Sequence, residues 1–249
     1  KNNATPPDGT AYRASDWAGA ISARYAFTPE FAAFGTVAYN TSLPILDDLP
    51  DAALVTTTEK ARTYELGLSY DGSDVLASED RLAVKVTGFR TEIRDNTTYT
   101  NYNSAAAGQI DLEGVEFELS YAHPAFYVDL NASRMRARWG DGSWFNNAPA
   151  DSVQLTLGKR FLNDQLDLSV EMRHDWATDR NLQFGGGVVN APAFTVWSAS
   201  AAYTPDTGPF DGVQFRGGIE NLLDTQYTPY LSSRPAQGRS FKFSVVKVF

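Results

Sequence analysis

Apolar and polar residues alternate along most of this chain with a period of two. In the segment FTVWSASAAY (194–203), Trp197, Ala199, Ala201 and Tyr203 share one parity, and two serines stand between them. This period is typical of β-strands, and no long stretch has the 3.6-residue period of a helix. The pattern predicts eleven strands, at residues 17–27, 31–41, 58–70, 81–93, 110–121, 125–138, 151–161, 166–176, 194–203, 212–223 and 239–249.

The lengths of the strands and of their connections favour a membrane protein. Most strands have about ten residues or more, as a tilted strand that crosses a bilayer requires. Short turns alternate with long loops, as in outer-membrane barrels. The short turns are 28–30, 122–125 and 162–165, the connection 204–211 is of modest length, and the long loops are 42–57, 94–109, 139–150, 177–193 and 224–238. The segment DGSDVLASED (71–80) is the exception, and we interpret it as a solvated turn.

Aromatic residues mark both ends of the apolar stripes. At the short turns the stripes end on Tyr25, Tyr70, Tyr121, Phe161, Tyr203 and Phe249, and at the long loops they end on Trp17, Trp139 and Trp176. The opposite stripes carry polar residues, among them Arg24, Glu65, Glu116, Glu118, Gln154 and Arg160. Two aromatic girdles around an apolar band predict an all-β, antiparallel, up-and-down transmembrane β-barrel. A soluble β-sandwich explains the alternation but not the repeated terminal aromatics.

Composition narrows the possible chemistry. The chain of 249 residues has a net charge of −9, which argues against a nucleic-acid partner. It has no cysteine and two histidines, so it has neither disulfides nor zinc-thiolate sites, and we expect no metal site and no cofactor. The mean hydropathy of −0.33 would suggest a soluble protein, but the alternation of a barrel hides its membrane face from an average.

The C-terminal segments GGIENLLDTQYTPYL (217–231) and PAQGRSFKFSVVKVF (235–249) resemble the end of TonB-dependent outer-membrane receptors. Asn221, Leu222 and Asp224 match the motif that ends the penultimate strand of that family, and Gly238 and Arg239 match the pair that opens the last strand. Segments 59–70 and 112–121 resemble further barrel strands of these receptors. The resemblance also implies that the last strand carries the signal read by the barrel-assembly machinery, at Phe241, Phe243, Val245 and Phe249.

The resemblance implies a domain organisation. Receptors of this family are 22-stranded barrels of the bacterial outer membrane, filled by an N-terminal plug domain that contacts the TonB complex. Residues 1–249 would be the C-terminal portion of the barrel, strands twelve to twenty-two, with the plug and the first half of the barrel absent from this chain. We therefore expect the chain to exist only beside that missing half, because eleven strands cut from a larger barrel leave two unpaired edges in lipid.

The resemblance further implies import of a scarce ligand, and a ferric siderophore or a haem-type iron chelate fits best. Loop residues that could hold an anionic, aromatic chelate by charge and stacking are Trp144, Phe145, Arg180, Phe184, Tyr227, Tyr230 and Arg234. An equally good interpretation is that they order the loops. The stretch 40–58, where haem receptors of this family often place a ligating histidine, has none. We expect His123 to be structural or exposed, and His174 to face outward.

Catalytic chemistry has no support in the sequence. Glu116 and Glu118 are two residues apart on one strand face, which fits a polar barrel interior better than an acid–base pair. No Ser/His/Asp or Cys/His arrangement is assembled, so the chain is not expected to be an enzyme. The leading hypothesis is energy-dependent import. The alternatives are a passive porin or structural barrel without energy coupling, and, less favoured, a soluble β-rich binding module.

Overall fold

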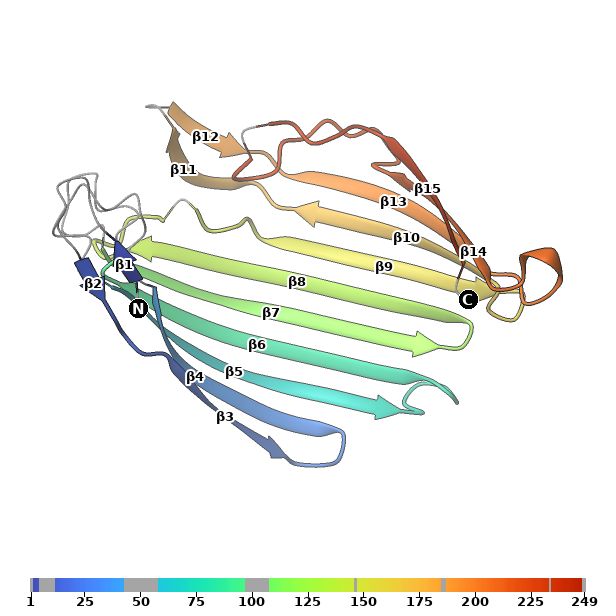
Figure 1. Ribbon diagram of the computed structural model, residues 1–249, viewed down its shortest axis with the longest axis horizontal. Helices are drawn as coiled ribbons and strands as arrows, with labels where there is room; N and C mark the ends of the chain where they lie inside the picture. Colours follow the sequence, from blue (N-terminus) through green and yellow to red (C-terminus); the bar gives the residue numbers. More distant parts are fainter. Residues whose placement is uncertain are drawn as a thin grey trace.

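Eleven strands form one antiparallel sheet in the computed structural model (Figure 1). The structure describes residues 2–4, 12–42, 58–96, 108–145, 147–184, 187–232 and 234–247. All eleven strands lie where the alternation predicts them. They are β3 (Gly19–Ala26), β4 (Phe31–Ser42), β5 (Glu59–Ser73), β6 (Arg81–Arg94), β7 (Ile110–His123), β8 (Phe126–Trp139), β9 (Ser152–Phe161), β10 (Leu166–Asp175), β13 (Phe194–Tyr203), β14 (Val213–Glu220) and β15 (Ser240–Lys247).

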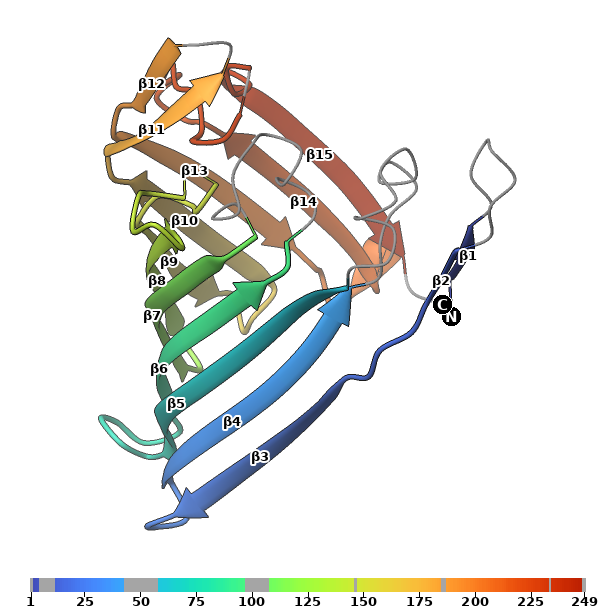
Figure 2. The same ribbon diagram turned by 90° about the vertical axis from the view of Figure 1, so that its left-hand side faces the viewer.

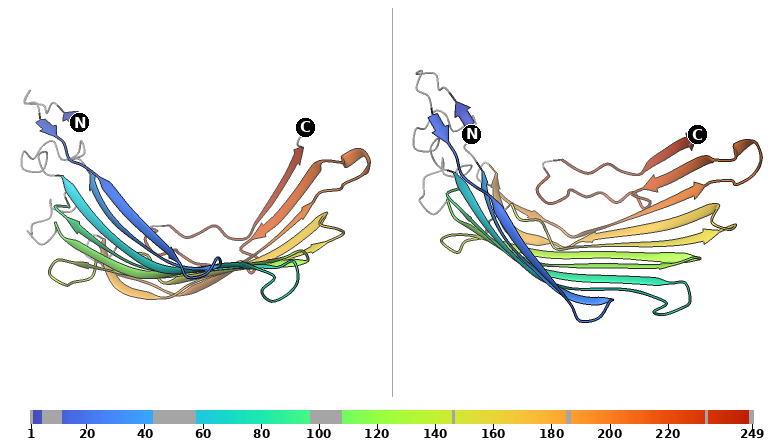
Figure 3. Two further views of the ribbon diagram at one scale, coloured as in Figure 1. Left: turned by 90° about the horizontal axis from the view of Figure 1, so that it is seen from below. Right: turned by 60° about the horizontal axis from the view of Figure 1, so that its bottom comes forward.

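The sheet is an up-and-down wall that curves into a trough (Figures 2 and 3). Each strand pairs with the next strand of the wall, and the short turns gather at one end, opposite the long connections (Figure 1). We call these the short-turn end and the long-loop end. Within the described residues, β3 and β15 are the outermost strands and no ladder joins them. No helix among the described residues has the length and apolarity needed to cross a membrane.

Two further hairpins lie at the long-loop end (Figure 1). One is β1 (Asn2–Ala4) with β2 (Tyr12–Ala14), and the other is β11 (Thr178–Phe184) with β12 (Gly187–Ala191). The second corrects the sequence analysis, which treated 177–193 as a loop. A 3₁₀ turn, η3 (Gly208–Phe210), lies in the connection between β13 and β14.

The register gives the wall one apolar face and one polar face. Leu68 lies opposite Val86, and Val86 lies opposite Phe117, so apolar side chains continue from strand to strand on the same face. Many are exposed, with 72% of Leu66 and 74% of Phe241 accessible. Exposed apolar side chains on strands of eight to fifteen residues are what a lipid-facing wall requires. The alternation had predicted the same face.

Hydroxyl pairs between neighbouring strands recur on the polar face. Ser22 and Thr36 have their oxygens 3.0 Å apart, and Ser169 and Ser200 have theirs 2.7 Å apart. Thr63–Thr91 and Ser133–Ser152 repeat the arrangement. Cross-strand hydroxyl pairs each stabilise a sheet by roughly 0.2–1 kcal/mol. The polar face is therefore a regular hydrogen-bonded surface.

Three aromatic rings on the polar face each cover a glycine of the neighbouring strand. Phe34 lies opposite Gly67, Phe89 opposite Gly114 and Tyr127 opposite Gly158. A Cβ atom added at any of these glycines would come within 3.0 Å of the ring. The pairs join β4 to β5, β6 to β7 and β8 to β9, which are strand pairs linked by long connections. A long connection does not fix the register of the two strands that it joins. We infer that the ring–glycine pairs fix the register of these strand pairs.

The segment 71–80 is only in part the solvated turn that we expected, since most of its residues are exposed. Its first three residues continue β5, and Asp80 is only 2% exposed. The Asp80 carboxylate accepts the backbone N–H groups of Val75, Leu76 and Ala77 at 2.7–2.9 Å, and the hydroxyl of Tyr121 at 3.0 Å. Tyr121, which we placed in the short-turn girdle, is thus buried under this loop.

The aromatic girdles are confirmed in part. At the short-turn end, Leu166 lies between Phe161 and Tyr203, and all three share the apolar face. At the long-loop end Trp139 is wrongly assigned, because it lies opposite Ile110 and has the parity of the polar face. The parity is hard to read there, since arginines replace apolar residues on the other face of β8. Phe249 lies outside the described residues.

Candidate functional site

The polar face carries a hollow of about 360 Å³ across β7, β8 and β9, lined by Glu116, Glu118, Gln154 and Arg173 among others. Lys85 pairs with Glu118 at 2.9 Å. The Nε2 atom of Gln154 donates to Glu171 at 2.9 Å. The two glutamates therefore belong to a mixed-charge polar wall, as the sequence indicated, and have no acid–base geometry of their own.

A second hollow of the polar face, of about 780 Å³, lies over β9, β10 and β13–β15. Arg216, Glu220 and Lys242 line it, and Lys242 forms an ion pair with Glu220. Charges of both signs and serines alternate along this surface. Ile219, Phe241 and Phe243 also line the hollow, so it combines apolar and charged side chains.

A cluster lies at the long-loop end of the polar face. Arg173 donates two hydrogen bonds, of 2.8 and 2.9 Å, to the carboxylate of Asp175, and Asp175 is buried opposite Phe194. The ring of Tyr227, from the connection between β14 and β15, lies 4.3 Å from the ring of Phe194. We call Arg173, Asp175, Phe194 and Tyr227 the rim cluster. It combines a cation with aromatic surface, which are the groups that bind anionic aromatic ligands.

The loop candidates Trp144 and Phe145 are held by the end of β8. The guanidinium of Arg138 lies 3.9 Å from the ring centre of Trp144, and these two residues also form a backbone bridge. The ring of Phe145 packs edge-on against Trp139 at 4.9 Å. These contacts order the loop after β8, whereas the ligand role expected for the two aromatics remains a prediction.

The other loop candidates are spread over the long-loop end. Arg180 and Phe184 belong to β11, and their side chains lie outside the described residues. Tyr230 and Arg234 follow β14, where the backbone N–H of Arg234 donates to the Ser232 hydroxyl at 3.3 Å. Their ligand role also remains a prediction. Tyr227 alone of the candidates lies in the rim cluster, whose other members the sequence analysis missed. Parity could have placed Arg173 and Phe194 on the polar face, but not their contact with a loop.

The C-terminal motif ties the last long connection together. Asn221 is 3% exposed, and its side chain bonds the backbone of Thr225 at both atoms and the carbonyl of Gln237. Asp224 accepts the backbone N–H of Arg239 at 2.8 Å. Both residues have a positive φ, of 52° and 55°, a conformation that asparagine and aspartate tolerate. The motif residues are structural, and they deliver β15 to its place beside β14.

Neither histidine faces the polar side of the wall as a free ligand. His123, at the end of β7, accepts the backbone N–H of Ala125 at 3.1 Å within the short turn, as expected. His174 lies on the apolar face, as expected, where it hydrogen-bonds Thr195 at 2.8 Å and packs edge-on against Trp176. No group of three or more His, Cys, Asp or Glu side chains within the described ranges could hold a metal ion.

The family model described as TonB dependent receptor-like, beta-barrel, matches residues 1–222. The chain belongs to this family. Its eleven antiparallel strands are a wall of a TonB-dependent receptor barrel, so the fold and family expected from the sequence are confirmed. The family consists of transporters and receptors of the bacterial outer membrane and not of enzymes.

Curated relatives of this receptor chain are haem proteins of Haemophilus. "Heme/hemopexin utilization protein C" of Haemophilus influenzae (strain 86-028NP) is 21% identical over 208 residues, covering 77% of this chain and 29% of the relative. "TonB-dependent heme receptor A" of Haemophilus ducreyi is 21% identical over 281 residues, covering 94% of this chain and 38% of the relative. The chain thus spans about a third of the length of these relatives.

Solved structures share the fold. The FrpB iron transporter from Neisseria meningitidis (F5-1 variant) has a TM-score of 0.76 at 19% identity, over 98% of this chain and 41% of that one. The copper transporter OprC has a TM-score of 0.73 at 16% identity, over 92% of this chain and 39% of that one. The receptor wall described above therefore corresponds to less than half of each complete chain.

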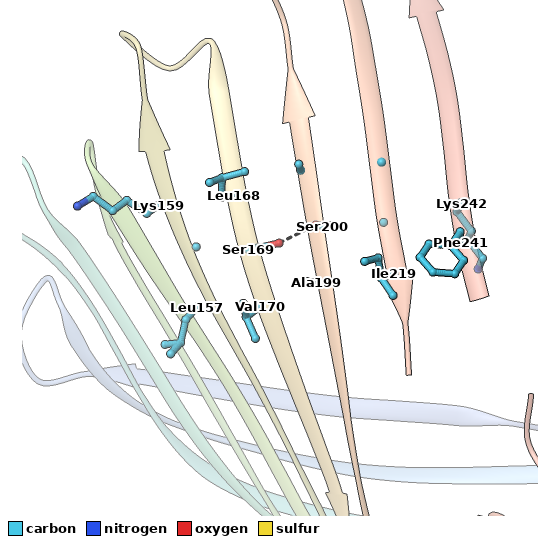
Figure 4. Close-up of a pocket in the computed structure, with 14 residues that line it drawn as sticks. Leu157, Lys159, Leu168, Ser169, Val170, Ala199, Ser200, Ile219, Phe241 and Lys242 are labelled. Atoms are coloured by element: carbon cyan, nitrogen blue, oxygen red, sulfur yellow. Dashed lines mark hydrogen bonds between the residues drawn. The ribbon is translucent and has the colours of Figure 1, made fainter. Parts of the chain in front are cut away.

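In a receptor barrel the apolar face lies against lipid, and Figure 4 shows a groove on it over β9, β10, β13, β14 and β15. Leu157, Val170, Ile219 and Phe241 line this groove of about 730 Å³ (Figure 4). Its hollow shape comes from the small residues Ala199, Ala201 and Gly217 between the larger side chains. Phe241, Phe243 and Val245 share the apolar face with it, as the proposed assembly signal requires.

Proposed function

We propose that residues 1–249 are the C-terminal portion of the barrel of an outer-membrane, TonB-dependent importer, corresponding to strands twelve to twenty-two. The plug domain and the first half of the barrel would come from the rest of the receptor and complete the wall at β3 and β15. This proposal is supported by the share of the relatives that the chain covers, 29–38%. It is also supported by the cost of leaving backbone donors and acceptors unpaired in lipid, several kcal/mol for each group.

The cargo that we propose is a ferric siderophore or a haem-type iron chelate. The single observation that carries this choice is the rim cluster, in which Arg173 and the rings of Phe194 and Tyr227 meet at the long-loop end of the polar face. The names of the Haemophilus relatives and the family agree with it. Both histidines of the sequence are engaged elsewhere, so this chain would hold the chelate by charge and stacking and not by imidazole ligation.

The remaining partners follow from the same proposal. Lipid would cover the apolar face, and the TonB complex would act through the plug. The barrel-assembly machinery would recognise the last strand, at Phe241, Phe243, Val245 and Phe249. The loop residues Trp144, Phe145, Arg180, Phe184, Tyr230 and Arg234 would complete the ligand surface around Tyr227.

The test uses the full-length receptor in a strain that lacks its own iron-chelate receptors. Growth on haem or on a ferric siderophore as the sole iron source should require both the receptor and TonB. Arg173→Gln with Tyr227→Ala should reduce uptake and chelate binding, whereas Arg24→Gln, on the polar face near the short-turn end, should not. A heat-dependent gel shift verifies that each variant is folded. Uptake that is independent of TonB, together with passive entry of sugars into receptor-loaded liposomes, would instead indicate the porin alternative.

A further inference from the structure

The apolar face changes character at the long-loop end of β5–β8. From the level of Leu66, Gly88 and Val115 toward the long-loop end, the same face carries charged side chains on all four strands. On these strands the basic ones are Lys60, Arg62, Arg90, Arg94, Arg134, Arg136 and Arg138, and the acidic ones are Glu92, Asp111 and Glu113. Asp95 and Asp151, just outside the strands, pair with Lys60 and Arg136. In a chain of net charge −9, this patch is net positive.

A groove of about 630 Å³ lies where the apolar band meets these charges. Its floor is formed by Tyr64, Leu66, Gly88 and Val115. Its rim carries Arg90, Arg134 and Arg136, and one carboxylate, Glu113, which lies opposite Arg90 on one side and Arg136 on the other. Gly88 has no side chain, so the space above it is open. A Cβ atom there would meet only the carbonyl oxygen of Leu66, at 3.8 Å, and a larger side chain would project into the groove. The groove is therefore apolar at one end, and at the other end its three arginines outnumber its one glutamate.

The rim arginines have donors to spare. The side chain of Arg134 is 72% exposed, and its ion pair, with Asp151, is long at 3.9 Å. Asp151 is already held by two hydrogen bonds from Arg136. The side chain of Arg90 is 56% exposed and pairs with Glu92 at 3.1 Å through one nitrogen. A guanidinium has five N–H donors, so each of these arginines can also bind a phosphate.

The register places the arginines at the depth of lipid headgroups. Arg134 lies opposite Val115, and Arg90 is two residues beyond Gly88 on β6. Two residues of strand rise by roughly 7 Å, so the cations begin level with the last apolar residues, at Arg134, and continue directly above them, at Arg90. An arginine at this level reaches the interface without a penalty and meets the anionic groups of the leaflet.

We propose that this groove binds a phosphorylated, acylated lipid of the outer leaflet. The phosphate would bind Arg90 and Arg134. Arg136 would keep its hydrogen bonds to Asp151, so that this carboxylate does not compete for Arg134. An acyl chain would lie on Leu66, Gly88 and Val115. Charge complementarity selects an anionic lipid, and the apolar floor distinguishes a lipid from a free phosphate. The proposal rests on the membrane location of the barrel, but it is independent of which iron chelate is carried.

The experiment measures lipid binding to the full-length receptor by native mass spectrometry and by titration in detergent. The probes are bisphosphorylated lipid A, the same lipid without phosphates, and inorganic phosphate as a competitor. Arg90→Gln with Arg134→Gln should weaken binding of the phosphorylated lipid by about tenfold or more, since that corresponds to the loss of one charge-assisted hydrogen bond. Gly88→Leu should weaken binding of both lipid forms, because the new side chain fills the groove.

The matched control is Arg24→Gln, an arginine of the opposite face, which should leave lipid binding unchanged. An unaltered gel shift shows that each variant is folded. Equal affinity for the two lipid forms, or full binding by the double arginine variant, would overturn the proposal. Displacement of the lipid by inorganic phosphate, with no effect of Gly88→Leu, would also overturn it and indicate a phosphate site. If the wild-type receptor binds the lipid as expected but takes up no iron chelate, that result would count against the proposed cargo only.

Discussion

The Oδ1 atom of Asp224 accepts the backbone N–H of Arg239 at 2.8 Å and lies directly against Gly238. A Cβ atom at position 238 would be 2.8 Å from that oxygen, so only glycine leaves room for the carboxylate. This contact is a physical reason for an aspartate just after β14 to occur together with a Gly-Arg pair, fourteen residues later, just before β15.

Gly238→Ala should loosen the connection between β14 and β15. The added methyl group displaces the Asp224 carboxylate and weakens its bond to Arg239, at a cost of about 1 kcal/mol. Limited proteolysis of the folded receptor should cut this connection faster. Gly217→Ala is the control, since a Cβ atom there has no neighbour within 4 Å. Equal proteolysis of the two variants would contradict this account.

The ring of Tyr127 and Gly158 should be energetically coupled. Gly158→Ala places a methyl group inside the ring, and the three nearest atoms all belong to Tyr127. We expect overpacking to destabilise the barrel by about 1–3 kcal/mol. In a Tyr127→Ala background the same change should cost much less. A double-mutant cycle on urea unfolding measures this difference, and additive effects would show that the ring does not constrain the glycine. Gly88→Ala is the control, since a Cβ atom there makes only an ordinary contact with the carbonyl oxygen of Leu66, at 3.8 Å.

The loop held by Asp80 should open in acid. Burial raises the pKa of the Asp80 carboxyl, but the N–H groups of Val75, Leu76 and Ala77 and the Tyr121 hydroxyl outweigh it, so the pKa is lowered. Because the pKa is lowered in the folded state, the carboxylate stabilises the folded loop at pH values above the pKa of the unfolded state, about 3.9. That stability is lost as the pH falls through the lowered value.

Proteolysis of segment 74–80 as a function of pH tests this expectation. Cleavage should be slow from neutral pH down to about 4 and rise only below it. Asp80→Asn should be cleaved quickly at all pH values, because an amide has one acceptor oxygen where the carboxylate uses two. Asp206→Asn, in an exposed turn, should behave as the wild type. A pH profile unchanged by Asp80→Asn would refute the role of this carboxylate.

The alternation predicted all eleven strands because a period of two maintained over about ten residues is a strong local signal. It assigned the faces correctly in the apolar band and failed at Trp139, where arginines occupy the apolar parity of β8 and parity no longer distinguishes lipid from lumen. The burial of Asp80 was missed because its partner Tyr121 is 41 residues away. The rim cluster was missed for the same reason, since Phe194 and Tyr227 meet only in the folded chain.

The isolated chain should not form a closed barrel. Residues 1–249 expressed alone should lack the heat-dependent gel shift of a monomeric barrel, because β3 and β15 would expose unpaired backbone groups to lipid. Co-expression with the remaining part of the receptor should restore the shift. A stable, heat-modifiable monomer formed by this chain alone would favour the small-porin alternative.

The ring–glycine pairs on β4–β9 make the register of the wall independent of its long loops. Because Phe34, Phe89 and Tyr127 align strands that long connections join, register there does not depend on what the connections contain. The entropic cost of a longer loop is small, about 0.6 kcal/mol for each doubling of its length. These connections can therefore change in length and sequence while the strands that carry them keep the same register.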